Sequence, residues 1–505
     1  MFPETSRTGA AQRARGMPEE PPGAGRDRVR RTLGVLFPES PPPPERTWSL
    51  RALSVAVQVA AVGIATVVML LRIPLRLPSW DTIYAEDYFE FTTQALQKHW
   101  NIFIGHNSYW QFLPRLIAQF VVYLPVTQWS RAYAVAGALV GACCALFIYH
   151  ASAGHIRSAW LRVLLAVALV LLPAAPMEII DSGVNSVWYL LPAMFWALLW
   201  RPRTRAGAAL VLVLAFTAVA SNILGILFAP LVVARLYTLR RPFGDAVSIG
   251  WLVGCLSQIP FIVSAYQSGS SRLSSQPAPP GLSLAFYGHD VVLPAFGWHV
   301  VWWLKSLAGL NGATAIVGVA LVAIFAVILA TQAAARPFVV TALVIGFIFP
   351  VLGITVTAHL ARATMFPAEQ PGSRYTVLPI YLFVSAAIVA VDYALRRRRA
   401  PAQPELSEPG RGPEPAPGPG PEPAPAPRPA RGHVRPAVAV TALVAVLAFS
   451  WVVDFQYVGW RSNWGWTWAP IAAKWQHDCA ISKTGDITEK AGAIFQTLPC
   501  DRIRS

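Results

Sequence analysis

The sequence predicts an all-α protein, a polytopic bundle of transmembrane helices. Of its 505 residues, 55% are hydrophobic and only 13% are charged, which is too apolar for a water-soluble globular chain. Apolar runs of about 15 to 22 residues recur along the chain, and a helix of about 20 residues crosses a hydrocarbon core about 30 Å thick. We expect helical spans because a helix satisfies its own backbone hydrogen bonds inside lipid.

Each expected span rests on one apolar run, and there are about eleven of them. One further run, 112–126, has only about 15 residues. We interpret it as a tilted or interfacial helix; the alternative, a full crossing, would reverse the side of every later loop. The expected spans lie near 52–73, 131–150, 160–176, 188–200, 207–220, 222–236, 246–266, 311–331, 337–357, 375–393 and 436–453.

The distribution of basic residues indicates the orientation of a multi-pass protein in the cell membrane. With the N-terminus in the cytoplasm, every strongly basic connector also lies there, as the positive-inside rule requires. The same rule accounts for the net charge of +16 without nucleic-acid binding. These connectors contain Arg157 and Arg162, residues 201–205 and 235–241, Arg336, and residues 396–399.

Composition divides the chain into five parts. A Pro-rich, low-complexity segment cannot bury enough apolar surface to fold, and an odd number of spans places the end of the chain outside. The parts are a disordered cytoplasmic N-terminal tail (1–50), a transmembrane core (51–399) with an external loop at 74–130, a disordered Pro-rich cytoplasmic linker (400–436), a last transmembrane helix (437–453) and an external C-terminal tail (454–505).

The external tail contains two of the five cysteines, Cys479 and Cys500. An oxidising exterior permits a disulfide between them, which we expect, and two separate free thiols are the alternative. The other three, Cys143, Cys144 and Cys255, lie in expected spans. None of the five has the spacing of a zinc site.

Four acids lie close together directly after the first expected span, in the stretch SWDTIYAEDYFEF at 79–91. They are Asp81, Glu86, Asp87 and Glu90. On a helix, like charges three or four residues apart repel, which costs stability unless a cation, a proton or a substrate hydroxyl compensates. A catalytic site explains this cost, and a solvated acidic face of an interfacial helix is the plainer alternative.

Three arginines of the expected external face are candidates for binding a lipid phosphate. Arg115 follows Pro114 in HNSYWQFLPRLIAQ, and Arg374 stands beside Tyr375 where an external loop re-enters the membrane. Arg362 lies in the same loop. Arginine binds phosphate well, although anchoring to ordinary lipid headgroups is the alternative use.

The external connection PMEIIDSGVNSVWYLLP has the composition of a sugar site. Glu178, Asn185 and Trp188 combine a carboxylate and an amide for hydroxyl groups with an indole for the apolar face of a sugar. Helix capping by Ser182 or Asn185 is the alternative. The tryptophans at 451, 460, 464, 466, 468 and 475 are expected mostly in the aromatic belt at the membrane interface.

Three short motifs in this order carry a resemblance to a known family. The acid pair in YAEDYFEF, then YWQFLPRLIA, then GSRYTVLP before a late span resemble bacterial, actinobacterial-type multi-pass membrane glycosyltransferases of the GT-C superfamily. Over about residues 52–500, the order of loops and spans is also similar. Many members have a glycine after the acid pair, where this chain has Tyr88.

The resemblance implies a GT-C-like fold and a glycosyltransferase that moves a sugar from a polyprenyl-phosphate donor to a cell-envelope glycan or lipid acceptor on the outer face. The family's catalytic carboxylate matches Asp87 best, with Glu86 beside it and Asp81 as the competitor. A single displacement would invert the anomeric centre, with Arg374 and then Arg115 stabilising the leaving phosphate. A divalent cation, Mg²⁺ or Mn²⁺, between the acids and the phosphate is left open.

Two other classes of function compete with this one. A transporter or flippase of polyprenyl-linked glycans would be expected to show internal repeats and charges in the middle of its spans, and the sequence shows neither. A membrane scaffold without activity would keep the fold alone. A transfer assay separates the enzyme from both alternatives.

Overall fold

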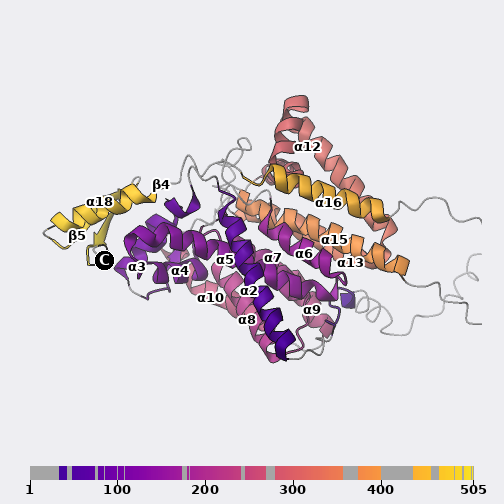
Figure 1. Cartoon of the computed structure of the whole chain (residues 1–505), viewed down its shortest axis with the longest axis horizontal. Helices are drawn as coiled ribbons and strands as arrows, with labels where there is room; N and C mark the ends of the chain where they lie inside the picture. Colours follow the sequence, from indigo (N-terminus) through magenta and orange to yellow (C-terminus); the bar gives the residue numbers. More distant parts are fainter. Residues whose placement is uncertain are drawn as a thin grey trace, which may run out of the picture.

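The computed structural model is mostly helical in the residues that it describes (Figure 1). These are 33–41, 48–73, 78–84, 86–98, 100–106, 108–172, 179–180, 182–239, 245–268, 279–356, 373–399, 436–456, 466–482, 484–491, 494–501 and 503. The predicted Pro-rich linker lies almost entirely outside them. Part of the predicted N-terminal tail differs from expectation, because Leu36 and Phe37 are buried against the bundle and Ser40 donates a hydrogen bond to the carbonyl of Arg201.

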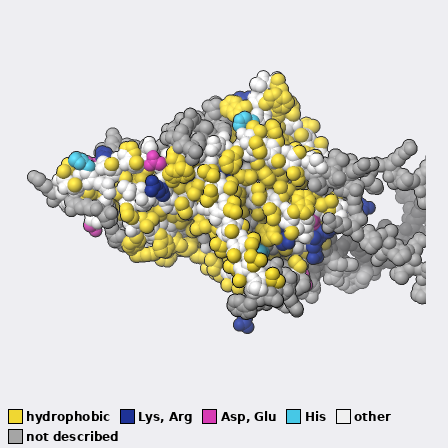
Figure 2. Space-filling model, in the orientation of Figure 1, with side chains coloured by type: hydrophobic (Ala, Val, Ile, Leu, Met, Phe, Trp, Pro, Cys, Tyr) yellow, Lys and Arg dark blue, Asp and Glu magenta, His cyan; other side chains and the backbone are white. Residues whose placement is uncertain are grey.

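Six of the helices are long and apolar enough to cross a membrane. The face seen in Figure 2 is covered by hydrophobic side chains with few charges among them, as lipid contact requires. The six are α2 (Trp48–Leu70), α5 (Trp129–Ala151), α10 (Ala246–Gln267), α12 (Trp298–Thr331), α13 (Arg336–Val356) and α15 (Val377–Arg399).

The other expected spans are also helical, but they are shorter. They are α6 (Ala159–Val170), α7 (Val187–Leu199), α8 (Arg205–Ser221), η6 (Ile223–Phe228) continued by α9 (Ala229–Leu239), and α16 (Pro436–Val453). The chain is therefore consistent with a multi-pass membrane protein, and in the described residues six helices rather than eleven are long and apolar enough to cross a membrane. The doubtful run at 112–126 forms α4 (Phe112–Val121), which at about 15 Å is too short to cross.

The centre of the bundle forms where small residues allow helices to approach closely. All 13 residues of α7 are buried. Helices α8 and α10 meet at Gly250, where an added Cβ would lie 2.2 Å from the carbonyl oxygen of Leu212. Only glycine fits this contact, which is the usual way that helices pack in lipid without a strong hydrophobic driving force.

A buried ion pair joins α9 to the start of α10. The guanidinium of Arg235 donates two hydrogen bonds to Asp245, each 2.8 Å long, and the two side chains are 2% and 9% exposed. The same carboxylate accepts from the backbone and the hydroxyl of Ser248 and so caps the start of α10. The pair compensates two charges that would be costly to bury alone.

The tail and the first external loop pack together at one end of the bundle (Figure 1). Strand β1 (Thr82–Ile83) pairs with β4 (Trp466–Thr467), and helix α18 (Trp468–Ile481) follows directly. The structure also contains two hairpins that the all-α prediction omitted, β2 (Gly105–His106) with β3 (Tyr109–Trp110), and β5 (Asp486–Ala491) with β6 (Ile494–Pro499). That the loop and the tail lie outside the cell stays a prediction.

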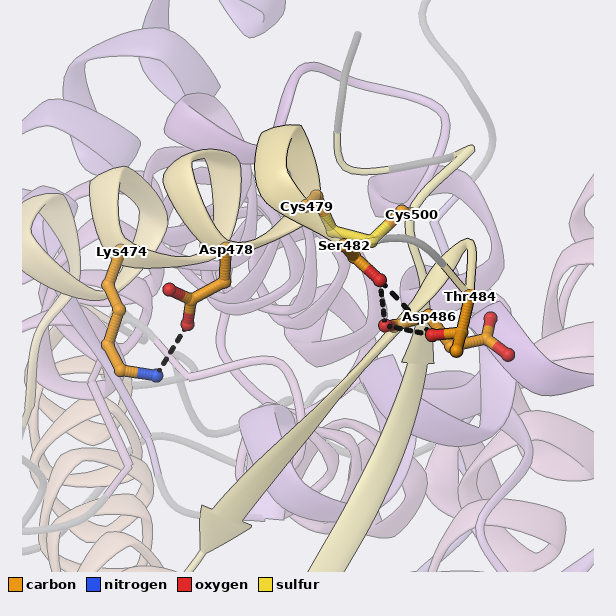
Figure 3. Close-up of a disulfide and its surroundings, with 7 residues drawn as sticks. All are labelled: Lys474, Asp478, Cys479, Ser482, Thr484, Asp486 and Cys500. Carbon is orange, nitrogen blue, oxygen red and sulfur yellow. Dashed lines mark hydrogen bonds and ion pairs between the residues drawn. A yellow bond between two sulfur atoms is a disulfide. The ribbon is translucent and has the colours of Figure 1, made fainter.

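Two features hold the tail in place. Cys479 and Cys500 form the disulfide, with sulfur atoms 2.04 Å apart, between α18 and the end of β6 (Figure 3). Trp468 and Trp475 are each 1% exposed and pack around Tyr88 and Trp129. These two tryptophans fill a core, which differs from the expected position in an interfacial belt.

Candidate functional site

The acidic stretch forms a short π-helix, η2 (Asp87–Thr92), followed by α3 (Thr93–Gln97). The hydroxyl of Thr92 donates to the carbonyl oxygen of Asp87 at 2.6 Å and also bonds the hydroxyl of Tyr133 at 2.8 Å. Turns with this wider hydrogen-bond spacing are rare and often occur at functional sites. Two acids of this π-helix have different partners: Asp87 bonds the segment before α7, and Glu90 bonds Gln94.

Asp87 points into the protein and has no exposed surface. Its carboxylate accepts hydrogen bonds from the hydroxyl of Ser182 at 2.9 Å, the backbone of Gly183 at 2.9 Å and the backbone of Val184 at 2.7 Å. A side chain at position 183 is excluded, since an added Cβ would lie 2.8 Å from the carboxylate. The three donors precede α7, whose amino end favours a negative charge. Asp87 thus joins the acidic stretch to the start of α7.

The accessibility of the three predicted catalytic acids differs. Asp81 and Glu86 are half-buried and retain exposed surface, whereas Asp87 has none. A general base must come within hydrogen-bond distance of the hydroxyl that it deprotonates. In this arrangement Asp87 holds the segment in position, and the accessible acids are its neighbours.

Arg115 lies on α4, beneath the acidic stretch, and is 3% exposed. Its Nη1 donates to Gln94 at 2.6 Å, and its guanidinium lies 5.2 Å from the centre of the Phe91 ring. Its Nε and Nη2 are buried and have no hydrogen-bond partner among the described residues. Burial lowers the pKa of Arg115 to about 10, with partial compensation by the charge of Glu90, so the guanidinium stays protonated at neutral pH.

Glu90 and His106 complete this group of side chains. Glu90 accepts a hydrogen bond from Gln94 at 2.6 Å, and its other oxygen lies 3.4 Å from Nδ1 of His106. The imidazole packs edge-on against Phe91, with 5.7 Å between ring centres. We call Glu90, Phe91, Gln94, His106 and Arg115 the Arg115 cluster.

Trp188, Tyr375 and Arg374 form a second group, between the start of α7 and the start of α15. The rings of Trp188 and Tyr375 lie 4.9 Å apart, and Arg374 lies 5.8 Å from the centre of the Tyr375 ring. Both aromatic side chains are buried, at 6% and 5% exposure. The neighbouring Asn185 is 1% exposed, and its backbone donates to the Ser182 hydroxyl at 3.3 Å. This bond lies within the turn before α7; the N-cap of α7 is Ser186, which makes no side-chain capping bond.

The structure brings some of the predicted site residues together and leaves others undescribed. Asp87 connects the acidic stretch with the segment that leads to Asn185 and Trp188, and Trp188 contacts Tyr375. Arg115 belongs to the other side of the acidic stretch. Arg362 and Glu178 lie outside the described residues.

Three polar residues near these groups were not selected from the sequence. Gln94 and His106 gave no signal of their own, although Glu90 and Gln94 have the spacing of neighbours on a helix. Asp290 is the third; it lies on the π-helix η7 (Tyr287–Val292), which contacts the turn η10 (Ser373–Thr376) that carries Arg374. Burial raises the pKa of Asp290 to about 7.

Two further observations bear on identity. Among the residues that the structure describes, no three His, Cys, Asp or Glu side chains gather into a group that could hold a metal ion. Comparison of the chain with known protein families, with curated proteins and with solved structures found no match.

Proposed function

We propose that this chain is a membrane glycosyltransferase, which moves a sugar from a polyprenyl-phosphate donor to a cell-envelope acceptor on the outer face, with inversion at the anomeric carbon. The observation that supports it most is Arg115, a buried guanidinium whose Nε and Nη2 are unpaired among the described residues, directly beside accessible acids of the external segment. Phosphate is the ligand that this arrangement suits best, because guanidinium binds it through two parallel hydrogen bonds.

The free-energy cost of burying the unpaired N–H groups of Arg115 is the reason for expecting a ligand. A buried polar group without a partner costs about 1–3 kcal/mol, and more when it is charged. Contact with Phe91 and Gln94 offsets part of this cost. A donor phosphate that displaces the covering side chains would accept hydrogen bonds from both Nε and Nη2.

The position of α4 suits a donor that carries a lipid tail. Phe120, Tyr123 and Leu124, at and just after the end of α4, are 59%, 51% and 43% exposed. Such side chains are typical of a helix lying at the membrane interface. The polyprenyl chain can therefore stay in lipid while its phosphate reaches the other face of α4.

The proposed roles differ among the predicted residues. Arg115 stabilises the leaving phosphate, and Arg374 is the second candidate for that role. Asp87 is a positioning residue that holds the acidic stretch against α7. If Arg374 binds the phosphate, the adjacent Trp188 and Tyr375 would form an aromatic wall for the sugar.

A transfer assay with the purified protein in lipid nanodiscs tests this function. Radiolabelled polyprenyl-phosphate pentoses and hexoses are offered as donors with cell-envelope glycan fragments as acceptors. We expect transfer from at least one donor, and an approximately 10²-fold lower kcat/KM for Arg115→Gln. Arg131→Gln is the control, because Arg131 is exposed and, in the described part of the chain, bonds only Gln128, three residues away.

The outcomes separate the competing functions. Folded protein that transfers no sugar from any donor, yet moves labelled polyprenyl lipid across a vesicle membrane, would identify a transporter. Folded protein that does neither would indicate a scaffold. Equal loss in both arginine variants would show that Arg115 has no particular role.

A further inference from the structure

His106 and Glu90 are arranged as a base and the group that orients it. Glu90 faces Nδ1 of His106 at 3.4 Å, a length typical of catalytic contacts before substrate tightens them. In the part of the chain that the structure describes, Nε2 of His106 has no hydrogen-bond partner. The imidazole side chain is 10% exposed and Glu90 is 32% exposed, so neither is completely buried.

The dyad shares its support with the proposed phosphate site. Gln94 links Glu90 to Arg115 through two hydrogen bonds of 2.6 Å, one to each. Phe91, itself 1% exposed, contacts both the guanidinium and the imidazole. A proton acceptor and an anion-binding group are therefore held by the same two residues, Gln94 and Phe91.

We propose that His106, oriented by Glu90, is the proton acceptor of the transfer reaction. This inference rests on the proposed function and deepens it. None of the predicted catalytic acids is needed for the step, and the Asp87 carboxylate is buried and already accepts three hydrogen bonds. Carboxylate–imidazole pairs do this work in many enzymes, because the carboxylate fixes the tautomer and stabilises the imidazolium that forms.

The step balances in atoms and charge. Nε2 of His106 takes the proton of the acceptor hydroxyl while the hydroxyl oxygen forms a bond to the anomeric carbon. The bond from that carbon to the phosphate oxygen breaks, and its electron pair leaves with polyprenyl phosphate. Glu90 then faces an imidazolium, and Arg115 faces the additional negative charge on the phosphate.

Substitution of His106 tests the inference in the nanodisc transfer assay. His106→Gln should lower kcat by about 10²-fold or more, while the dissociation constant for polyprenyl phosphate, used as the binding probe, changes by less than about twofold. His106→Ala should recover activity when imidazole is added, which a purely structural role would not produce. Glu90→Gln should lower kcat by about 10-fold. His477→Gln is the control, because His477 is exposed on α18.

The possible results distinguish failure of the His106 proposal from failure of the proposed glycosyltransferase function. If the parent protein transfers sugar and His106→Gln retains its kcat, the dyad is overturned and the glycosyltransferase stands. A His106→Gln variant that loses polyprenyl-phosphate binding to the same degree as activity also overturns it, since His106 would then only shape the site. If the folded parent transfers no sugar from any donor, both proposals fall.

Discussion

At Asp87, a carboxylate is held away from solvent by three hydrogen bonds from the segment before α7. Replacing it with asparagine turns one acceptor into a donor that faces another donor. We expect Asp87→Asn to destabilise the protein by about 2–4 kcal/mol, measured as a lower apparent melting temperature in detergent. Asp81→Asn should change little, because Asp81 is half-buried and lies outside this set of bonds. Equal melting temperatures for the two variants would disprove the structural role of Asp87.

The second residue-scale prediction concerns Asp290, which lies outside the six long apolar helices. Its pKa of about 7 in the folded protein is above the ordinary value of 3.8, because burial disfavours the charged form. The folded state therefore binds the proton more tightly than the unfolded state. Its contribution to stability is fully present below about pH 4 and is lost as the pH rises through about 7.

The Asp290 effect is measurable as a pH-dependent difference between two variants. Asparagine imitates the neutral acid, so Asp290→Asn should raise stability at pH 8 by on the order of 1–2 kcal/mol, since the residue is only half-buried. At pH 4 the variant and the parent should melt together. Asp486→Asn, an exposed position in the tail, serves as the control. A constant difference at both pH values would show that Asp290 is not desolvated.

At the scale of elements, the tail is a clamp on the acidic stretch. Strand β4 pairs with β1, Trp468 donates to the carbonyl of Val126 at 2.6 Å, and Tyr88 packs between Trp468 and Trp475. Tyr88 follows Asp87 in the chain, and the two neighbours have different partners. Tyr88 contacts the tail, and Asp87 contacts the segment before α7.

Removing the disulfide should loosen this clamp. The bond closes a loop between cysteines 21 residues apart, for which the chain-entropy model predicts about 3 kcal/mol. Cys479→Ser should therefore make the tail susceptible to limited proteolysis at a temperature where the parent resists. Cys143→Ser is the matched control, as Cys143 is an exposed free cysteine on α5. Equal resistance of both variants would mean that packing of the two tryptophans is enough.

The helices could be predicted from the sequence more completely than the site. Apolar runs indicate helices directly, and every expected span overlaps a helix of the described residues. Their lengths were less predictable, because a helix buried on all sides, such as α7, need not reach across the membrane by itself. Strand β4 could not be predicted, because it has two residues and its partner β1 lies far away in the sequence, as Thr82 and Thr467 show.

The site depended on long-range contacts that spacing does not encode. The acids of 79–91 were recognised as unusual, but the partners of Asp87 lie 95 to 97 residues away. Burial of Asp87 therefore could not be predicted. The role of His106 could not be predicted, because His106 meets its partner Glu90 only when the β2–β3 hairpin folds back over η2.

At the scale of the whole molecule, the proposed site lies at one end. The acidic stretch, the Arg115 cluster and the disulfide-closed tail lie at one end, and α9 lies toward the opposite end (Figure 1). The basic connectors of the sequence predict that the first of these ends faces outward. A lipid-linked donor would then be used in the outer leaflet.

Transfer in oriented vesicles tests this central claim most directly. Sealed membrane vesicles of both orientations are supplied with labelled polyprenyl-phosphate donors in the accessible leaflet and an impermeant acceptor outside. The account predicts transfer in right-side-out vesicles, its absence in inverted ones, and a loss of about 10²-fold in Arg115→Gln. Protein that is folded and correctly oriented but transfers sugar in neither preparation would contradict the account.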